Sequence, residues 1–154
     1  MKIYRKTFSV LILFFFTSSA YANSYIEHTE IRQLPELQQQ FILDVVRAYR
    51  ENDNELINSL LHSSIKSNVE CTSYMHDMFK NSTIHDSYAV KVKPGKKEGS
   101  LYFKIRYAPP DNPDSRSFKM MKNVVNENGR LVMNMNCEAV LKFIEKVKSQ
   151  KDKE

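Results

Sequence analysis

Glycine is scarce in this sequence, with only three among 154 residues. A glycine-rich loop, which binds phosphate groups through its backbone N–H groups, is therefore absent. The Gly-x-Ser-x-Gly turn that presents a catalytic serine and the His-Glu-x-x-His helix that binds zinc are absent as well. The common signatures of nucleotide binding, serine hydrolysis and zinc proteolysis thus give no indication of function.

The first 22 residues have the pattern of a secretory signal peptide. Lys2, Arg5 and Lys6 give a basic start, residues 8–16 are apolar, and Ala20-Tyr21-Ala22 is a small-x-small cleavage site. The apolar run is shorter than the roughly 20 residues of a permanent membrane span. We expect cleavage after Ala22, and hence a periplasmic or secreted protein with no stable membrane anchor. An uncleaved N-terminal anchor is the alternative.

Only two cysteines are present, Cys71 and Cys137, and both follow the cleavage site. An even number of cysteines in an exported chain predicts one disulfide. The loop that this bond closes is long, so the unfolded-state entropy model gives about 4 kcal/mol of stabilisation. Two buried free thiols are the alternative.

Removal of the signal peptide also changes the charge balance. Three of the 23 basic residues lie in the signal segment, which leaves 20 basic against 18 acidic residues and a net charge of +2. Net charge therefore gives no reason to expect nucleic acid as a partner. The remaining 132 residues suffice for one domain with one core.

Helical periodicity predicts the first elements of this domain, which we expect over 34–149 between a flexible N-terminus at 23–33 and a frayed tail at 150–154. Pro35 suits a first helical turn. Asn52 followed by Glu55 resembles a capping box that begins a second helix. A third helix is expected over 71–80. The first helix, over 35–50, has inward-facing residues at helical spacing: Leu37, Phe41, Val45 and Ala48.

The hydrophobic period then changes from 3.6 to 2, which predicts an antiparallel meander. Strands are expected over 88–93, 101–107, 116–125 and 131–137, with a tight turn at Asn128-Gly129 before the last strand. Residues 138–148 have the pattern of a final helix. The predicted fold class is α+β: N-terminal helices packed on a curved four-stranded antiparallel sheet, a C-terminal helix and one disulfide.

Residues 41–66, FILDVVRAYRENDNELINSLLHSSIK, resemble the opening of the nuclear transport factor 2-like superfamily. In that family a long helix ends in a small residue and an aromatic one, here Ala48-Tyr49. An acidic turn then begins a short helix that ends in Leu-Leu-His, here Leu60-Leu61-His62. The resemblance implies a curved sheet that closes a cone around a pocket. Because this superfamily includes isomerases, dehydratases, cyclases and non-catalytic binding domains, the fold does not select a function.

Two His-Asp dipeptides, His76-Asp77 and His85-Asp86, are candidates for acid/base chemistry. Neighbouring side chains diverge on a helix and take opposite faces on a strand, so neither dipeptide predicts a catalytic pair. The nine-residue spacing of the two histidines, and the expected disulfide at Cys71, argue against a metal site. We expect no metal and no cofactor. The catalytic candidates are His62, His76 and His85.

Seven methionines would suit a copper site, but four of them fall at core-facing positions of a predicted helix and strand. Core filling is therefore the preferred interpretation of Met75, Met78, Met133 and Met135.

Basic residues concentrate in the predicted sheet: residues 23–85 have a net charge of −4 and residues 86–130 a net charge of +5. Lys119 or Lys122 is expected beside the other basic residues of the outer sheet face. This face is either an ordinary solvated surface or a site that docks an acidic protein or an anionic envelope component. Its predicted binding residues follow from the period of 2: Lys91, Lys93, Tyr102, Lys104 and Arg106.

Three functions fit these features. The preferred one is an exported, non-catalytic binding protein, such as an inhibitor, an immunity protein or an accessory protein, that uses the outer sheet face or a cone pocket. A small isomerase- or cyclase-like enzyme with a pocket histidine and a carboxylate is the first alternative. A carrier of a small apolar ligand is the second.

Overall fold

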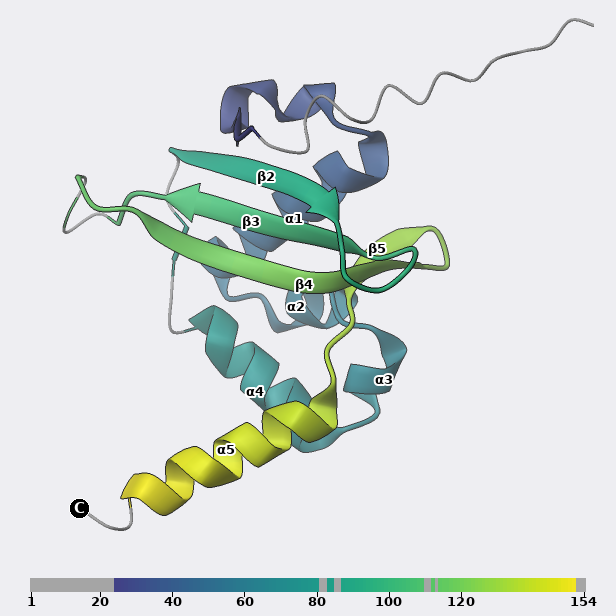
Figure 1. Cartoon of the computed structure of the whole chain (residues 1–154), viewed down its shortest axis with the longest axis vertical. Helices are drawn as coiled ribbons and strands as arrows, with labels where there is room; N and C mark the ends of the chain where they lie inside the picture. Colours follow the sequence, from purple (N-terminus) through teal and green to yellow (C-terminus); the bar gives the residue numbers. More distant parts are fainter. Residues whose placement is uncertain (1–23, 81–82, 85–86, 110–111, 113, 152–154) are drawn as a thin grey trace, which may run out of the picture.

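The computed structural model describes residues 24–80, 83–84, 87–109, 112 and 114–151 (Figure 1). The fold is α+β, as predicted. Its antiparallel sheet has the order β1-β2-β3-β4-β5. The strands are β1 (Ile26–Glu27), β2 (Tyr88–Pro94), β3 (Leu101–Tyr107), β4 (Ser117–Glu127) and β5 (Arg130–Met133). The helices are the 3-10 helix η1 (His28–Gln33), α1 (Glu36–Glu51), α2 (Asn54–Ser59), α3 (Ser63–Lys66), α4 (Val69–Lys80) and α5 (Cys137–Lys151).

The prediction of four strands was wrong, because a fifth strand precedes the first helix. Ile26 and Glu27 of β1 pair with Val90 and Ala89 of β2. Most of the segment expected to be flexible is therefore part of the fold, since η1 follows β1 directly. Ile26 and Ile31 are buried and belong to the hydrophobic core. Burial of these two residues and the backbone pairing with β2 both anchor this segment.

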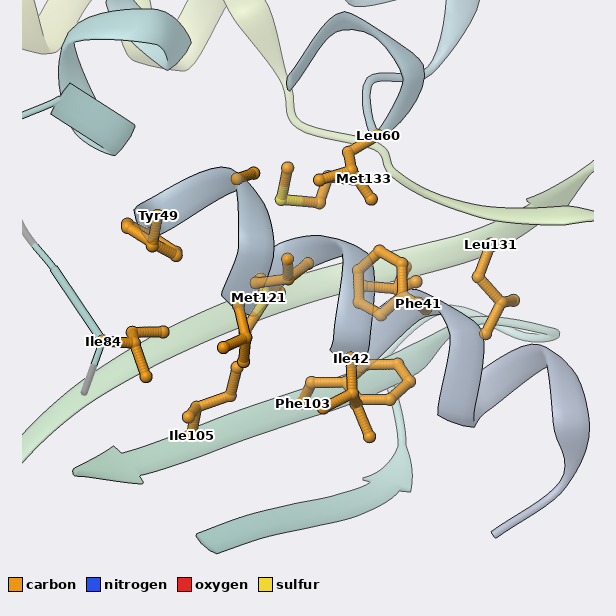
Figure 2. Close-up of a cluster of buried hydrophobic side chains, with 14 of the residues drawn as sticks. Phe41, Ile42, Tyr49, Leu60, Ile84, Phe103, Ile105, Met121, Leu131 and Met133 are labelled. Atoms are coloured by element: carbon orange, nitrogen blue, oxygen red, sulfur yellow. The ribbon is translucent and has the colours of Figure 1, made fainter. Parts of the chain in front are cut away.

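Helix α1 supplies the centre of the core (Figure 2). Phe41, Ile42 and Val45 are almost fully buried, and the ring centre of Phe41 lies 4.8 Å from that of Phe103 on β3. Each such side chain contributes roughly 1.5–3 kcal/mol by its burial. These side chains therefore fill the space between α1 and β3. Leu37, which we expected to face inward, is instead 42% exposed.

The turn after α1 differs in detail from the predicted capping box. Asn52 ends α1 in the left-handed conformation, with φ of 53°. Asp53 is the N-cap of α2, and its Oδ1 accepts hydrogen bonds from the backbone N–H groups of Glu55 and Leu56 at 2.9 and 3.1 Å. An N-cap carboxylate satisfies two donors that lack partners in the first helical turn.

The hairpin at Asn128-Gly129 has the predicted geometry. Both residues have positive φ, 55° and 82°, as a type I′ turn requires. β5 is shorter than predicted and ends at Met133. The chain then leaves the sheet, and Cys137 begins α5 rather than ending a strand.

The predicted disulfide joins Cys71, near the start of α4, to Cys137, the first residue of α5. Their Cα atoms are 5.7 Å apart, which is ordinary for a disulfide. This bond ties the C-terminal helix to α4 beneath the sheet (Figure 1). In the described part of the chain, no helix has the length and apolar character needed to cross a membrane.

Candidate functional site

Basic side chains cover the sheet face that points away from α1. Successive strands bring them together in rows. Read across the strands, these rows are Ala89–Arg106–Phe118, Lys91–Lys104–Met120 and Lys93–Tyr102. The predicted binding residues thus share one surface, which we call the basic face: Lys91, Lys93, Tyr102, Lys104 and Arg106.

Three cationic groups of the basic face lie over aromatic rings. Each such contact contributes about 0.5–1 kcal/mol at an exposed position. The rings therefore help to hold the charges close to the sheet. The distances to the ring centres are 4.7 Å for Lys93 Nζ and Tyr102, 3.8 Å for Lys104 Nζ and Phe118, and 4.4 Å for the guanidinium carbon of Arg106 and Tyr25.

The central pair of the basic face brings two like charges together. Lys91 and Lys104 are direct cross-strand partners, so their Cβ atoms are about 5 Å apart. Like charges in this arrangement destabilise a sheet. Glu27 offsets part of the charge through its ion pair with Arg106, at 3.4 Å. The pairing thus concentrates positive charge at the centre of the basic face.

Either Lys119 or Lys122 was expected beside the basic face. Lys122 is exposed, whereas Lys119 does not belong to that face. The register pairs Lys119 with the buried Ile105, so its side chain points toward the helices. Its Nζ lies 5.2 Å from the ring centre of Tyr49 and 5.9 Å from that of Tyr107. Burial lowers the pKa of Lys119 and raises that of Tyr49, and the nearby Tyr107 raises the latter further.

Sequence analysis missed two apolar side chains on the outer face of the sheet. Phe118 is 44% exposed and Met120 is 55% exposed. The usable signal was the alternation of Phe118 and Met120 with Lys119. It is ambiguous because Met121 follows directly and a register shift interrupts the β3–β4 ladder near this point. The outer face therefore combines positive charge with exposed apolar surface.

His62 is the N-cap of α3 rather than the end of the second helix. Its Nδ1 accepts the backbone N–H of Ser64 at 3.1 Å and lies 2.8 Å from the Ser64 hydroxyl, while Nε2 lies 3.3 Å from Glu127 Oε1. The hydroxyl and N–H of Ser63 donate to the same carboxylate, and these bonds lower the pKa of Glu127. The imidazole of His62 thus lies between a hydroxyl and a carboxylate. However, its Nδ1 already accepts the backbone N–H of Ser64, so it is not free to take a proton from the hydroxyl. We interpret the network as a cap that joins α3 to β4.

His76 connects α4 to α2. Its Nδ1 lies 2.9 Å from Asn54 Oδ1 and its Nε2 lies 2.8 Å from Asn58 Oδ1. A neutral imidazole has one N–H, so it donates to one of these amides and accepts from the other once that amide turns its NH₂ group inward. Burial and then Lys80 lower the pKa of His76, whereas Asp77 raises it. Both ring nitrogens of His76 are therefore engaged in joining the helices.

The second dipeptide, His85-Asp86, lies outside the described residues. Within the described ranges, no group of three His, Cys, Asp or Glu side chains is arranged to hold a metal ion. Cys71 is bonded to Cys137.

A groove with a cavity volume of about 350 Å³ lies between α4, α5 and β4. Core filling describes Met75 and Met133, which are buried, but Met78 and Met135 are only partly buried. We call this hollow the methionine groove, after the methionines that line it: Met75, Met78, Met120, Met121, Met133 and Met135. Its other lining residues include Tyr74, Lys122, Asn123, Val140 and Phe143.

No family model, no curated protein and no solved structure matches this chain. The candidate sites therefore rest on the geometry described above.

Proposed function

We propose that this protein is an exported, non-catalytic binding protein whose basic face docks an acidic protein. The observation that carries the proposal is the direct cross-strand pairing of Lys91 with Lys104, flanked by Lys93 and Arg106 on the same face. This concentration of positive charge on one face favours the approach of a complementary negative surface, because charge complementarity steers association and sets orientation.

Exposed apolar groups on the outer face favour a protein as the partner. Phe118 and Met120 lie beside the charged rows and are 44% and 55% exposed. Aromatic residues, methionine and arginine are enriched at protein interfaces, where they supply contact area that a purely ionic surface lacks. Tyr102, held beside Lys93, adds a further ring to this surface.

The polar contacts inside the fold support a binding role over an enzymatic one. The His62 ring caps α3, and the His76 ring connects α2 to α4, so the nitrogens of both imidazoles already have partners within the fold. The Phe41 and Phe103 rings meet in the layer between α1 and the sheet. The disulfide is compatible with an oxidising compartment, and together with the signal-peptide pattern it supports export.

The test compares wild type with a double charge reversal, Lys104→Glu with Arg106→Glu. Tagged proteins are used to capture partners from an envelope extract. The association rate of the partner retained by wild type is then measured against salt concentration. We expect the double variant to associate about tenfold more slowly at low salt, and the difference to shrink as salt screens exposed charges. The double variant loses the cation–π contacts of Lys104 and Arg106, each worth about 0.5–1 kcal/mol, so circular dichroism first checks that it is folded.

The matched control is Lys66→Glu with Lys80→Glu, which reverses two exposed lysines at the ends of α3 and α4. It changes the net charge equally but leaves the basic face intact, so its association rate should equal that of wild type. Equal rates for the Lys104 and Arg106 variant at low salt would overturn the proposal. Binding to vesicles of anionic lipid, with no protein retained, would overturn the choice of an acidic protein as the partner.

A further inference from the structure

Part of β4 is an open sheet edge. The strand pairs with β3 from Ser117 to Val124, but on its other side it pairs with β5 only from Val124 to Glu127. Among the described residues, no strand pairs with that other side over residues 117–122. Alternate residues of a strand direct their N–H and C=O groups to each side. This stretch therefore presents a row of backbone donors and acceptors roughly 20 Å long.

The methionine groove follows this edge. Four consecutive residues of β4, from Met120 to Asn123, line it, although successive side chains of a strand point to opposite faces. A hollow lined by both faces of a strand must run along the backbone edge between them. The other wall is formed by α4 and α5, with Phe143 of α5 57% exposed. Figure 1 shows both helices on the β4 side of the sheet.

The groove also adjoins the basic face. Lys122 and Asn123 line the methionine groove and, in addition, a second hollow of about 300 Å³ that includes Lys93 and Tyr102. The two flanks of the edge thus differ in chemistry. On the helix side the surface is apolar and rich in methionine. On the outer side it is basic, with Lys104 one strand away from Met120.

We propose that the β4 edge and the methionine groove bind an extended segment of a partner protein, added as a further strand, in which apolar and acidic side chains alternate. Strand addition satisfies the open backbone groups and places alternate side chains on the two flanks. Apolar side chains enter the methionine groove, where flexible thioether side chains adapt to different shapes. Acidic side chains lie beside Lys104 and Lys122.

Two other occupants fit the edge less well. A helix in the groove would bury the β4 edge without hydrogen bonds to its N–H and C=O groups, which is costly. A second copy of this chain, paired edge to edge, would bring two basic faces side by side and set like charges against each other. The open edge of β2 differs from that of β4, because it contains Pro94, which has no backbone N–H to donate, whereas residues 117–122 contain no proline.

The probe is a synthetic nine-residue peptide of alternating leucine and glutamate with blocked ends, and binding is measured by fluorescence anisotropy. Two further peptides have N-methyl groups on every second residue, one in each register. A strand directs alternate N–H groups to opposite sides, so one methylated peptide should lose affinity by tenfold or more, about the effect of blocked hydrogen bonds. The other should bind like the parent. The amides of residues 117–122 should exchange more slowly in the complex.

Phe143→Ala should weaken peptide binding about fivefold, because it removes an apolar wall of the groove. The matched control is Val69→Ala, which removes an 83% exposed apolar side chain that does not line the groove. A peptide in which lysine replaces glutamate should bind no more tightly than the methylated peptide that loses affinity. Its positive charges would repel the lysines on the outer side of the edge, if charge complementarity guides the segment.

Several results would overturn the inference. They are no binding of the parent peptide, equal binding of both methylated peptides, dimerisation of the protein through residues 117–122, or occupation of the groove by a fatty acid with no peptide binding. The bound segment shares Lys104 with the basic face, but the tests act on Phe143 and on the backbone edge of β4. Phe143→Ala leaves Lys104 and Arg106 in place, so failure of the strand-addition inference would not affect the proposal for the basic face.

Discussion

At the scale of the residue, His76 joins two helices and makes stability depend on pH. Its imidazole lies between two amides of α2, and burial and Lys80 lower its pKa. The unfolded chain, in which the ring has an ordinary pKa near 6.5, therefore binds a proton more readily than the folded protein does. Protonation favours the unfolded state, so the contribution of His76 is complete above pH 6.5 and declines as the pH falls below it.

We predict that the free energy of unfolding of wild type decreases between pH 7.5 and pH 5.5, and that His76→Gln flattens this dependence. Glutamine keeps polar contacts with the amides but does not titrate. Urea denaturation at several pH values measures the effect. His28→Gln, at an exposed histidine of η1, is the control and should retain the wild-type slope. An unchanged slope in His76→Gln would contradict this assignment.

The sequence pattern predicted which side chains of β2 and β3 face outward, but not which side chains of β4 do. The period of 2 placed Lys91, Lys104 and Arg106 on one face because each side chain of β2 and β3 obeys strict alternation. It failed in β4, where Met120 and Met121 are adjacent and a register shift follows. There the sequence could not tell whether Lys119 or its neighbours face outward. That choice depends on the pairing with β3, which is a tertiary property.

At the scale of the element, α5 depends on a single covalent tie. Cys137 is its first residue and is bonded to Cys71 of α4. Among the apolar residues of α5, Val140 is buried, whereas Phe143 remains 57% exposed. The helix therefore relies on the disulfide as well as on burial to remain beside α4, and it forms one wall of the methionine groove.

We predict that Cys71→Ser or Cys137→Ser lowers the free energy of unfolding by about 2–5 kcal/mol. The double variant should be little worse than either single variant, because all three lack the same bond. Urea denaturation gives the values, and thiol labelling of denatured, unreduced wild type should find no free cysteine. Labelling at both positions, or fully additive losses, would show that the bond does not form.

Elements long enough to contain several helical turns or strand alternations were predictable, and shorter elements were not. The first helix and the strands β2 and β3 were expected close to their observed bounds, because several turns or alternations define each of them. β1 has two residues and α3 has four, so neither shows a measurable period. β1 exists because Ile26 is buried and its backbone pairs with β2, a contact between residues far apart in the chain.

At the scale of the whole molecule, opposite charges are separated between the helical half and the sheet. Residues 23–85 have a net charge of −4 and residues 86–130 a net charge of +5, and the cross-strand register concentrates the positive charge further by pairing Lys91 with Lys104. Solvated surfaces commonly intersperse both signs, although lysine alone can also protect an exposed sheet. If the basic face is instead a docking surface, the free protein should retain measurable repulsion within it.

We therefore predict that the melting temperature of wild type rises as sodium chloride increases from about 0.01 M to 0.15 M, where the Debye length falls from about 30 to about 8 Å. Lys104→Gln removes one charge of the Lys91–Lys104 pair and should reduce this rise by roughly 1–3 °C. Lys146→Gln removes an exposed charge of α5, away from the basic face, and should leave the rise unchanged. Differential scanning calorimetry measures all three proteins. Equal salt dependence in wild type and Lys104→Gln would mean that the paired lysines only solvate the sheet, because repulsion between them would then be too small to favour a bound anion.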